Sequence, residues 1–289
     1  MTRAARAVLI FLSLSLLAGC TRPAEAPTSL PAPAPVPQRA FSFEGALVQG
    51  GMAIGQVPAD AVAVSLDGQD LPLSADRRFV VGFDRDAGPE ARIVARFADG
   101  SSLTHSLAIA DRDFPVEVLP GLKRRPSLSP EYQQLRAEEL ARIAAARAGA
   151  RDSDGWRQRW LWPVNGRITG VFGSQRILGG EPSDPHGGVD IRGDTGTVIV
   201  APADGIVALA SPPAFSLEGN LLIIDHGMGV SSAFLHMSRI DVREGEAVRR
   251  GQTVGAVGAT GRATGPHLHW GVKWRDIRID PALIAGPMP

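Results

Sequence analysis

The chain has 289 residues, and this length favours two folded units with appendages over one domain. Its 30 Lys and Arg residues balance its 30 Asp and Glu residues, so no net field attracts nucleic acid, and we expect no nucleic-acid partner. The 33 glycines and 23 prolines suit strands and turns better than a helical bundle, so the expected fold class is mainly β.

The first twenty residues have the pattern of an export signal. Two arginines precede an apolar run, residues 7–17, which is shorter than the ~20 residues that span a bilayer. Residues 1–19 are therefore predicted to be a signal peptide. The run ends in LAGC, which resembles a bacterial lipobox and implies cleavage before Cys20 and lipid attachment to it. The alternative is an ordinary signal peptide followed by an incidental cysteine.

Residues 20–40 are rich in proline and alanine and have almost nothing to bury, which is typical of an extended tether. Cys20 is the only cysteine of the chain, so acylation gives it a purpose that an internal disulfide cannot. Thr21 follows it in place of Asp, which by analogy with lipoproteins of two-membrane bacteria favours the outer membrane. We expect a protein of the cell envelope, attached to the membrane through a lipid on Cys20, at the periplasmic face of the outer membrane.

Residues 41–122 contain short runs of alternating apolar residues. Asp-Gly pairs at 67–68 and 99–100 are strong hairpin signals. We predict a small β-sandwich-like accessory module. Its one histidine, His105, lies in an alternating run and is expected to face solvent, so a positioning or binding role is the default for this module.

A linking helix is predicted within residues 127–150. Ser129 is a suitable N-cap, Pro130 suits the first helical position, and the following residues are strong helix formers. Leu135, Leu140 and Ile143 form only a thin apolar stripe, so this helix is expected to lie on a domain surface.

Residues 156–289 again contain glycine-rich, strand-like runs with no long helical period, which predicts a second β domain. Five of the six histidines lie in it. His186 and Asp190 stand in PHGGVDI, where an extended strand would hold them ~13 Å apart, so two ligands here require the glycines to let the chain curl. A turn with an incidental His and Asp is the alternative.

His267 and His269 are two residues apart, so on a strand they project from one face. This spacing is compatible with two metal ligands. It is equally compatible with one metal ligand and one imidazole that faces the substrate. His236 enters a turn in FLHMS, and either it or His226 can complete a site. His226 stands beside turn glycines and is interpreted as a packed or hydrogen-bonding turn residue.

Four motifs in order, PHGGVDI, APADGIV, FLHMS and TGRATGPHLHWGV, resemble the lysostaphin-type (LytM-like) zinc metalloendopeptidases that hydrolyse bacterial peptidoglycan. The resemblance covers residues 160–284 and implies an antiparallel β peptidase domain. An upstream β module with a connecting helix is similar to the arrangement in a proteobacterial subgroup of this family. The runs at 174–184 and 258–265 are expected to form loops beside the cleft.

The resemblance implies one zinc ion per chain, held by the metal ligands His186, Asp190 and His269, with water in the open fourth position. It makes His236 and His267 the catalytic residues that hold the water and stabilise charge, in roles that are not divided between them. Zinc lowers the pKa of its water to about 7, so a neutral imidazole is a suitable proton acceptor.

The sequence departs from the family in one respect. The only tyrosine, Tyr132, is outside the domain, so no tyrosine hydroxyl is expected to assist catalysis. The predicted function is hydrolysis of peptide cross-links in peptidoglycan by a zinc-activated water. The alternative is a non-catalytic regulator that binds the cell wall or activates a peptidoglycan amidase. Relatives of that kind usually lack a metal ligand. A cell-envelope protein partner would belong to this alternative, and the sequence does not identify it.

Overall fold

The structure is a computed structural model that describes residues 39–119, 129–149 and 151–289. The predicted signal peptide, Cys20 and nearly all of the predicted tether lie outside the described residues. Strands dominate the described part, so the expected mainly β fold class is confirmed. No helix in these three ranges is long and apolar enough to cross a membrane.

The N-terminal module is built from two antiparallel sheets. One has the strand order β1-β2-β5 and the other the order β4-β3-β6-β7. Both Asp-Gly pairs form hairpin turns, in which Gly68 and Gly100 adopt φ of 84° and 83°. The strand bounds are β1 Ser42–Gly45, β2 Met52–Gln56, β3 Ala61–Leu66, β4 Gln69–Leu71, β5 Arg78–Gly82, β6 Glu90–Phe97 and β7 Ser102–Ala108.

A further strand of the N-terminal half pairs with the C-terminal half. β8 (Val116–Leu119) runs parallel to β10 (Gln175–Leu178), which pairs antiparallel with β11 (Glu181–Pro182). The run at 174–184 was expected to be a loop, and this expectation is wrong because β8 supplies a hydrogen-bonding edge from a distant part of the chain. A hairpin therefore precedes the His186 segment.

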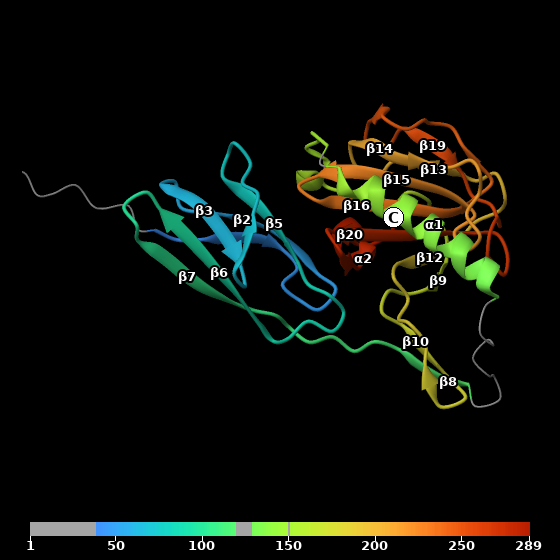
Figure 1. Cartoon of the computed structure of the whole chain (residues 1–289), viewed down its shortest axis with the longest axis horizontal. Helices are drawn as coiled ribbons and strands as arrows, with labels where there is room; N and C mark the ends of the chain where they lie inside the picture. Colours follow the sequence, from blue (N-terminus) through green and yellow to red (C-terminus); the bar gives the residue numbers. More distant parts are fainter. Residues whose placement is uncertain (1–38, 120–128, 150) are drawn as a thin grey trace, which may run out of the picture. The chain divides into compact units, whose positions relative to one another are not determined.

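The C-terminal domain is organised around one large sheet with the order β18-β14-β15-β16-β20-β12-β9, and β21 also pairs with β20 (Figure 1). A second sheet has the order β13-β19-β17. The bounds are β9 Ile168–Gly170, β12 Val189–Arg192, β13 Val198–Val200, β14 Gly205–Ala210, β15 Asn220–Gly227, β16 Val230–Met237, β17 Arg239–Ile240, β18 Ala247–Val248, β19 Thr253–Ala256, β20 His267–Trp274 and β21 Ile277–Ile279, with a 3-10 turn at Gly155–Arg157 and a short helix α2 at Pro281–Ala285.

The two faces of the large sheet are covered differently. Along β20 the residues alternate, so that Leu268, Trp270, Val272 and Trp274 are buried on one face while the residues between them are half-buried on the other. The buried face packs against Trp160 and Trp162 in the main core. The other face, which carries His267 and His269, is called the histidine face below.

Helix α1 (Pro130–Ala148) crosses the histidine face in front of β15 and β16 (Figure 1). The Ser129 side chain caps it by accepting a hydrogen bond from the Tyr132 amide. Ile143 and Ala146 bury against β14, β15 and β16, whereas Leu135 and Leu140 stay exposed. The helix thus lies on a domain surface, as its thin apolar stripe predicts.

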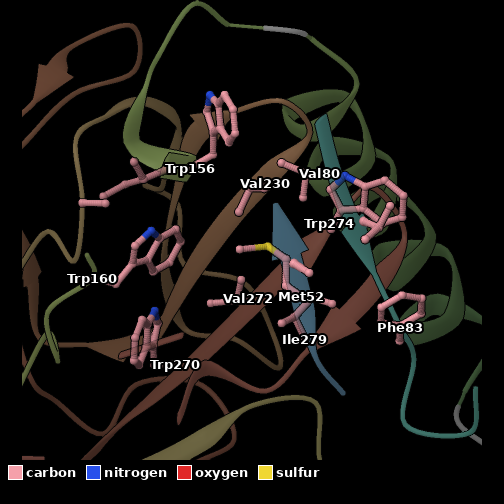
Figure 2. Close-up of a cluster of buried hydrophobic side chains, with 14 of the residues drawn as sticks. Met52, Val80, Phe83, Trp156, Trp160, Val230, Trp270, Val272, Trp274 and Ile279 are labelled. Carbon is pink, nitrogen blue, oxygen red and sulfur yellow. The ribbon is translucent and has the colours of Figure 1, made fainter. Parts of the chain in front are cut away.

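The main core is continuous between the two halves of the described chain. Figure 2 shows Met52, Val80 and Phe83 of the N-terminal module together with Trp274 and Ile279 of the C-terminal domain, all within one buried cluster. This shared core holds β5 against β20 and β21, at the far end of the strand that carries the two histidines.

The N-terminal module offers a test of its packing at Gly55. A Cβ there would lie 2.2 Å from Cζ of the Phe79 ring, which is fully buried. We expect Gly55→Ala to lower the free energy of unfolding by about 1–3 kcal/mol in urea titrations, because the ring has no space to move into. Gly88→Ala is the matched control, since a Cβ there meets nothing within 4 Å. Equal stability of the two variants would contradict this packing.

Candidate metal centre and active site

Three of the predicted residues bring ligand atoms together on the histidine face. Asp190 lies on β12, His269 lies on β20, and His186 lies in the segment just before β12. His269 Nδ1 is 2.8 Å from Asp190 Oδ1 and 3.0 Å from His186 Nε2, and His186 Nε2 is 3.1 Å from the same Oδ1. The donor atoms of the three residues all lie within 4.8 Å of one another.

Strand register produces this convergence. Asp190 and His269 are directly opposite in the β12–β20 pair, so their side chains stand together on one face. The backbone before β12 then passes close to β20, where a Cβ on Gly188 would lie 2.3 Å from the Trp270 carbonyl oxygen. Glycine permits this approach, and the curl returns His186 to the same place, as the sequence requires if His186 and Asp190 act together.

The donor set fits a divalent transition metal. Ligands about 2.0–2.1 Å from a tetrahedral zinc are ~3.3 Å from one another, close to the three separations observed. The other ring nitrogen of His186, Nδ1, is 3.0 Å from the Val171 carbonyl oxygen. Donation of Nδ1–H to this carbonyl leaves the Nε2 lone pair pointing into the cluster, which is the usual arrangement for a histidine ligand.

The electrostatics of the cluster favour a charged carboxylate. Burial opposes the charge on Asp190, but the close His186 and His269 rings hold the pKa of this carboxyl well below its usual range. Burial lowers the pKa of His269, against the opposing effect of Asp190. Burial opposes a charge on His186 as well, but Asp190 raises the pKa of His186 overall. Metal binding needs an ionised carboxylate and neutral imidazoles, so a metal ion competes with a proton at His186.

His236 joins this cluster through an irregularity in its strand. Leu235 is opposite His269, so strict alternation would turn His236 toward the main core. A register shift between β15 and β16 and a φ of 63° at His236 redirect the side chain. Its ring centroid lies 4.8 Å from that of His267 and 6.4 Å from that of His269. A positive φ at a non-glycine residue is costly and is concentrated at functional sites.

His236 and His267 are both oriented by backbone carbonyls. His236 Nδ1 is 2.8 Å from the Thr260 oxygen, and His267 Nδ1 is 2.8 Å from the Gly265 oxygen. Because a carbonyl only accepts, both Nδ1 atoms carry the proton and both Nε2 atoms are acceptors. His267 Nε2 is 3.9 Å from Asp190 Oδ1, farther than either His186 or His269. Burial lowers the pKa of His236, which favours its neutral form.

The two remaining histidines lie outside the cluster. His226 is fully buried, and its ring bonds to the Asp204 carbonyl and to the Ser232 hydroxyl, each at 2.7 Å. It is packed and hydrogen-bonded, as predicted, but it lies on β15 and the turn begins only after Gly227, so its placement in a turn is wrong. His105 is exposed on β7 and stacks on Phe43 with ring centroids 5.7 Å apart.

Contacts between distant loops support His236, and motif reading does not detect them. Its amide donates to the Glu218 carbonyl at 2.8 Å, and the Thr260 side chain accepts from the Asn220 amide. Tyr132, which the sequence places outside the domain, contacts one of these loops, since the Ser216 hydroxyl is 3.3 Å from the Tyr132 hydroxyl oxygen. No residue spacing signals these contacts, because α1 and both loops are far apart in the chain.

Comparison with known proteins agrees with this geometry. The chain matches Peptidase family M23 over residues 184–281. A solved structure from Pseudomonas aeruginosa assigned to peptidase M23 is 30% identical, with a TM-score of 0.61, and the match covers 83% of this chain and 94% of that one. On this fold and similarity, the chain belongs to the M23 peptidase family.

Curated relatives show the range of activities in this family. The chain is 32% identical over 128 residues to the peptidoglycan DD-endopeptidase ShyB of Vibrio cholerae, which is 44% of this chain and 26% of that protein. It is 34% identical over 122 residues to the murein hydrolase activator NlpD of Escherichia coli, which is 42% of this chain and 30% of that one. The chain thus spans about a fifth to a third of the length of the curated relatives that it matches.

Burial of His226 gives a pH-dependent stability. Burial lowers its pKa to about 4, whereas an unfolded histidine has a pKa of about 6.5. The unfolded chain therefore binds the proton first, and the stabilisation is complete above pH ~6.5 and is lost as the pH falls toward ~4, by about 3 kcal/mol in total. In urea titrations between pH ~6.5 and ~5, we expect His226→Gln to flatten the fall in unfolding free energy. Equal slopes in the two proteins would contradict a buried neutral His226.

Proposed function

We propose that the protein is a zinc-dependent endopeptidase that hydrolyses peptide cross-links of bacterial peptidoglycan. The observation that carries this proposal is the meeting of five groups at one place: His186, Asp190, His236, His267 and His269. A metal-binding triad beside two oriented imidazole acceptors is suited to amide hydrolysis. The DD-endopeptidase activity of the Vibrio cholerae relative on peptidoglycan supports peptidoglycan as the substrate.

In this proposal His186, Asp190 and His269 hold zinc. Two imidazole nitrogens and one carboxylate oxygen are ligands that zinc accepts, and three protein ligands are typical of its catalytic sites. When bound, zinc polarises an amide carbonyl and makes water a stronger nucleophile near neutral pH. The single carboxylate among the ligands leaves the centre with a net positive charge.

His236 and His267 would carry the protons. Each presents an unprotonated Nε2 because a backbone carbonyl holds its Nδ1–H. One of them can accept a proton from the attacking water and return it to the departing amine, while the other stays neutral and orients the water by accepting a hydrogen bond from it. Their ring centroids are 4.8 Å apart, so a proton received by one raises the cost of charging the other.

The second candidate function is activation of a peptidoglycan amidase without catalysis by this chain. Similarity to the murein hydrolase activator NlpD favours it. An activator has no need of a complete metal triad or of two oriented acceptors, and this chain has both groups in place. We therefore rank endopeptidase activity first, and a partner protein of the envelope would belong to the second candidate.

We also propose that the protein is anchored by lipid on Cys20 at the periplasmic face of the outer membrane. The support is the sequence around Cys20 and the proline-rich stretch that follows. Metabolic labelling with a fatty-acid analogue is expected to mark the protein, and Cys20→Ala is expected to remove the label. A labelled Cys20→Ala variant would contradict this anchor.

Digestion of cross-linked muropeptide dimers tests the proposed activity. The zinc-loaded full chain is expected to release monomers, and chelation of zinc is expected to stop the release. His236→Ala should lower kcat by about 10²- to 10⁴-fold, because it removes a proton-transfer group and leaves the metal ligands intact. His105→Ala, at an exposed position, is the control. If wild type releases no monomer yet stimulates an amidase, the activator function replaces the enzyme.

Metal analysis tests the ligand assignment separately from catalysis. We expect about one zinc ion per chain in wild type and in His236→Ala, and a loss of 10-fold or more in zinc affinity in His186→Ala. Zinc competition against a chromogenic chelator measures this directly. Unchanged affinity in His186→Ala would show that the metal is held elsewhere.

A further inference from the structure

Three basic side chains gather on the histidine face, beyond the metal centre. Lys273 lies four residues after His269 on β20, so both side chains project from the same face. Arg278 on β21 is the direct cross-strand partner of Lys273. Arg147, near the end of α1, is close enough to both to disfavour further positive charge. These three residues are called the basic triad below.

The basic triad has no carboxylate partner. Within the described residues, none of its three members forms an ion pair within 4.0 Å, although sixteen such pairs occur elsewhere in these ranges. Nε of Arg147 is buried without any hydrogen-bond partner in the same part of the chain. Asp276 and Asp84 favour the charge on Lys273, and Glu218 and Asp276 favour the charge on Arg147, in each case from beyond ion-pair distance. Arg278 is exposed, whereas Lys273 and Arg147 are half-buried. A half-buried cation is normally paired, so Lys273 and Arg147 are exceptional.

The charges of the triad are costly to keep together. Burial lowers the pKa of Lys273, and the neighbouring Arg147 and Arg278 lower it further. Three cations at a partly desolvated surface repel one another more strongly than they would in water. An anion placed among them would remove this repulsion and gain charge-assisted hydrogen bonds.

A short stretch of β20 lies between the triad and the metal centre. Gly271 separates His269 from Lys273 on the histidine face, and a Cβ there would lie 3.7 Å from His269 Nε2. The side chain of Arg278 extends toward the His186 segment, because a Cβ on Gly187 would lie 3.2 Å from Arg278 Cδ. Gly271 and Gly187 carry no side chain here, although the Gly187 carbonyl oxygen would lie 3.4 Å from a Cβ on Gly271. A peptide that followed β20 from the metal centre would reach Lys273 and Arg278.

We propose that Lys273, Arg278 and Arg147 form a subsite that binds a free carboxylate of the peptide substrate. The proposal rests on the endopeptidase function above and adds a determinant of its specificity. Four residues of a strand span ~13 Å, and the lysine and arginine side chains reach back part of this distance. The carboxylate would therefore belong to a residue within about one to three positions of the scissile amide.

Peptidoglycan stem peptides offer this group, since diaminopimelate keeps a free carboxylate after cross-linking. Amidation removes its charge with little change of shape. The subsite would thus distinguish acidic from amidated cross-links by charge, as an arginine or lysine distinguishes a carboxylate from an amide.

The test uses the zinc-loaded full chain and two muropeptide dimers that differ only in amidation of diaminopimelate. We expect wild type to have a KM about tenfold lower for the acidic dimer. In Lys273→Met and in Arg278→Gln this difference should shrink to within about twofold, with zinc content and thermal unfolding unchanged. Arg249→Gln is the control, since it removes an exposed arginine near the distant edge strand β18.

Equal KM for both dimers in wild type, or a tenfold preference that survives in Lys273→Met, would overturn the subsite. If wild type cleaves neither dimer, the endopeptidase function fails, and calorimetric binding of the intact dimers then decides on the subsite. Tighter binding of the acidic dimer that is lost in Lys273→Met supports the subsite in that case. Equal binding of both dimers overturns it.

Discussion

The pairing of β12, β20 and β16 is the constraint on which the functional site depends. Asp190 and Leu235 are both opposite His269, on either side of it in the sheet. A shift of one residue in the β12–β20 register would turn Asp190 into the main core and separate it from His269. The buried tryptophans on the other face fix the register, because Trp270 packs against Trp160 and Trp162. Packing on the buried face of the sheet thereby positions Asp190 and His269 on the opposite face.

Helix α1 is coupled to the same site through a nearly buried ionic network. Arg136 makes hydrogen bonds of 2.6 and 2.7 Å to the two oxygens of Glu218 and one of 2.9 Å to Glu139. Glu139 in turn accepts from the amide and hydroxyl of Ser216. The Glu218 backbone carbonyl accepts a hydrogen bond from the His236 amide. Through Glu218, α1 therefore also supports His236, whose φ is positive. The helix packs on β14, β15 and β16, whereas the histidine-face residues of β20 are half-buried.

Local patterns predicted much of this structure, and long-range contacts account for the rest. Alternation along β20 predicted that His267 and His269 share a face, and Ser129 with Pro130 predicted the start of α1. Spacing did not separate the roles of these two histidines. The family resemblance made His269 a metal ligand and His267 a catalytic residue. The bulge at His236 depends on pairing with β15, and the 174–184 hairpin depends on β8, so neither follows from local sequence. The basic triad likewise assembles from α1, β20 and β21.

The central claim is that one metal ion is held by three of the five clustered groups while two imidazoles stay free. Anomalous diffraction at the zinc edge, from crystals of the zinc-loaded protein, tests it most directly. We expect one strong peak within bonding distance of His186 Nε2, a carboxylate oxygen of Asp190 and His269 Nδ1, with Nε2 of both His236 and His267 outside bonding distance. A peak bonded to His236 or His267, or a peak away from Asp190, would contradict the account.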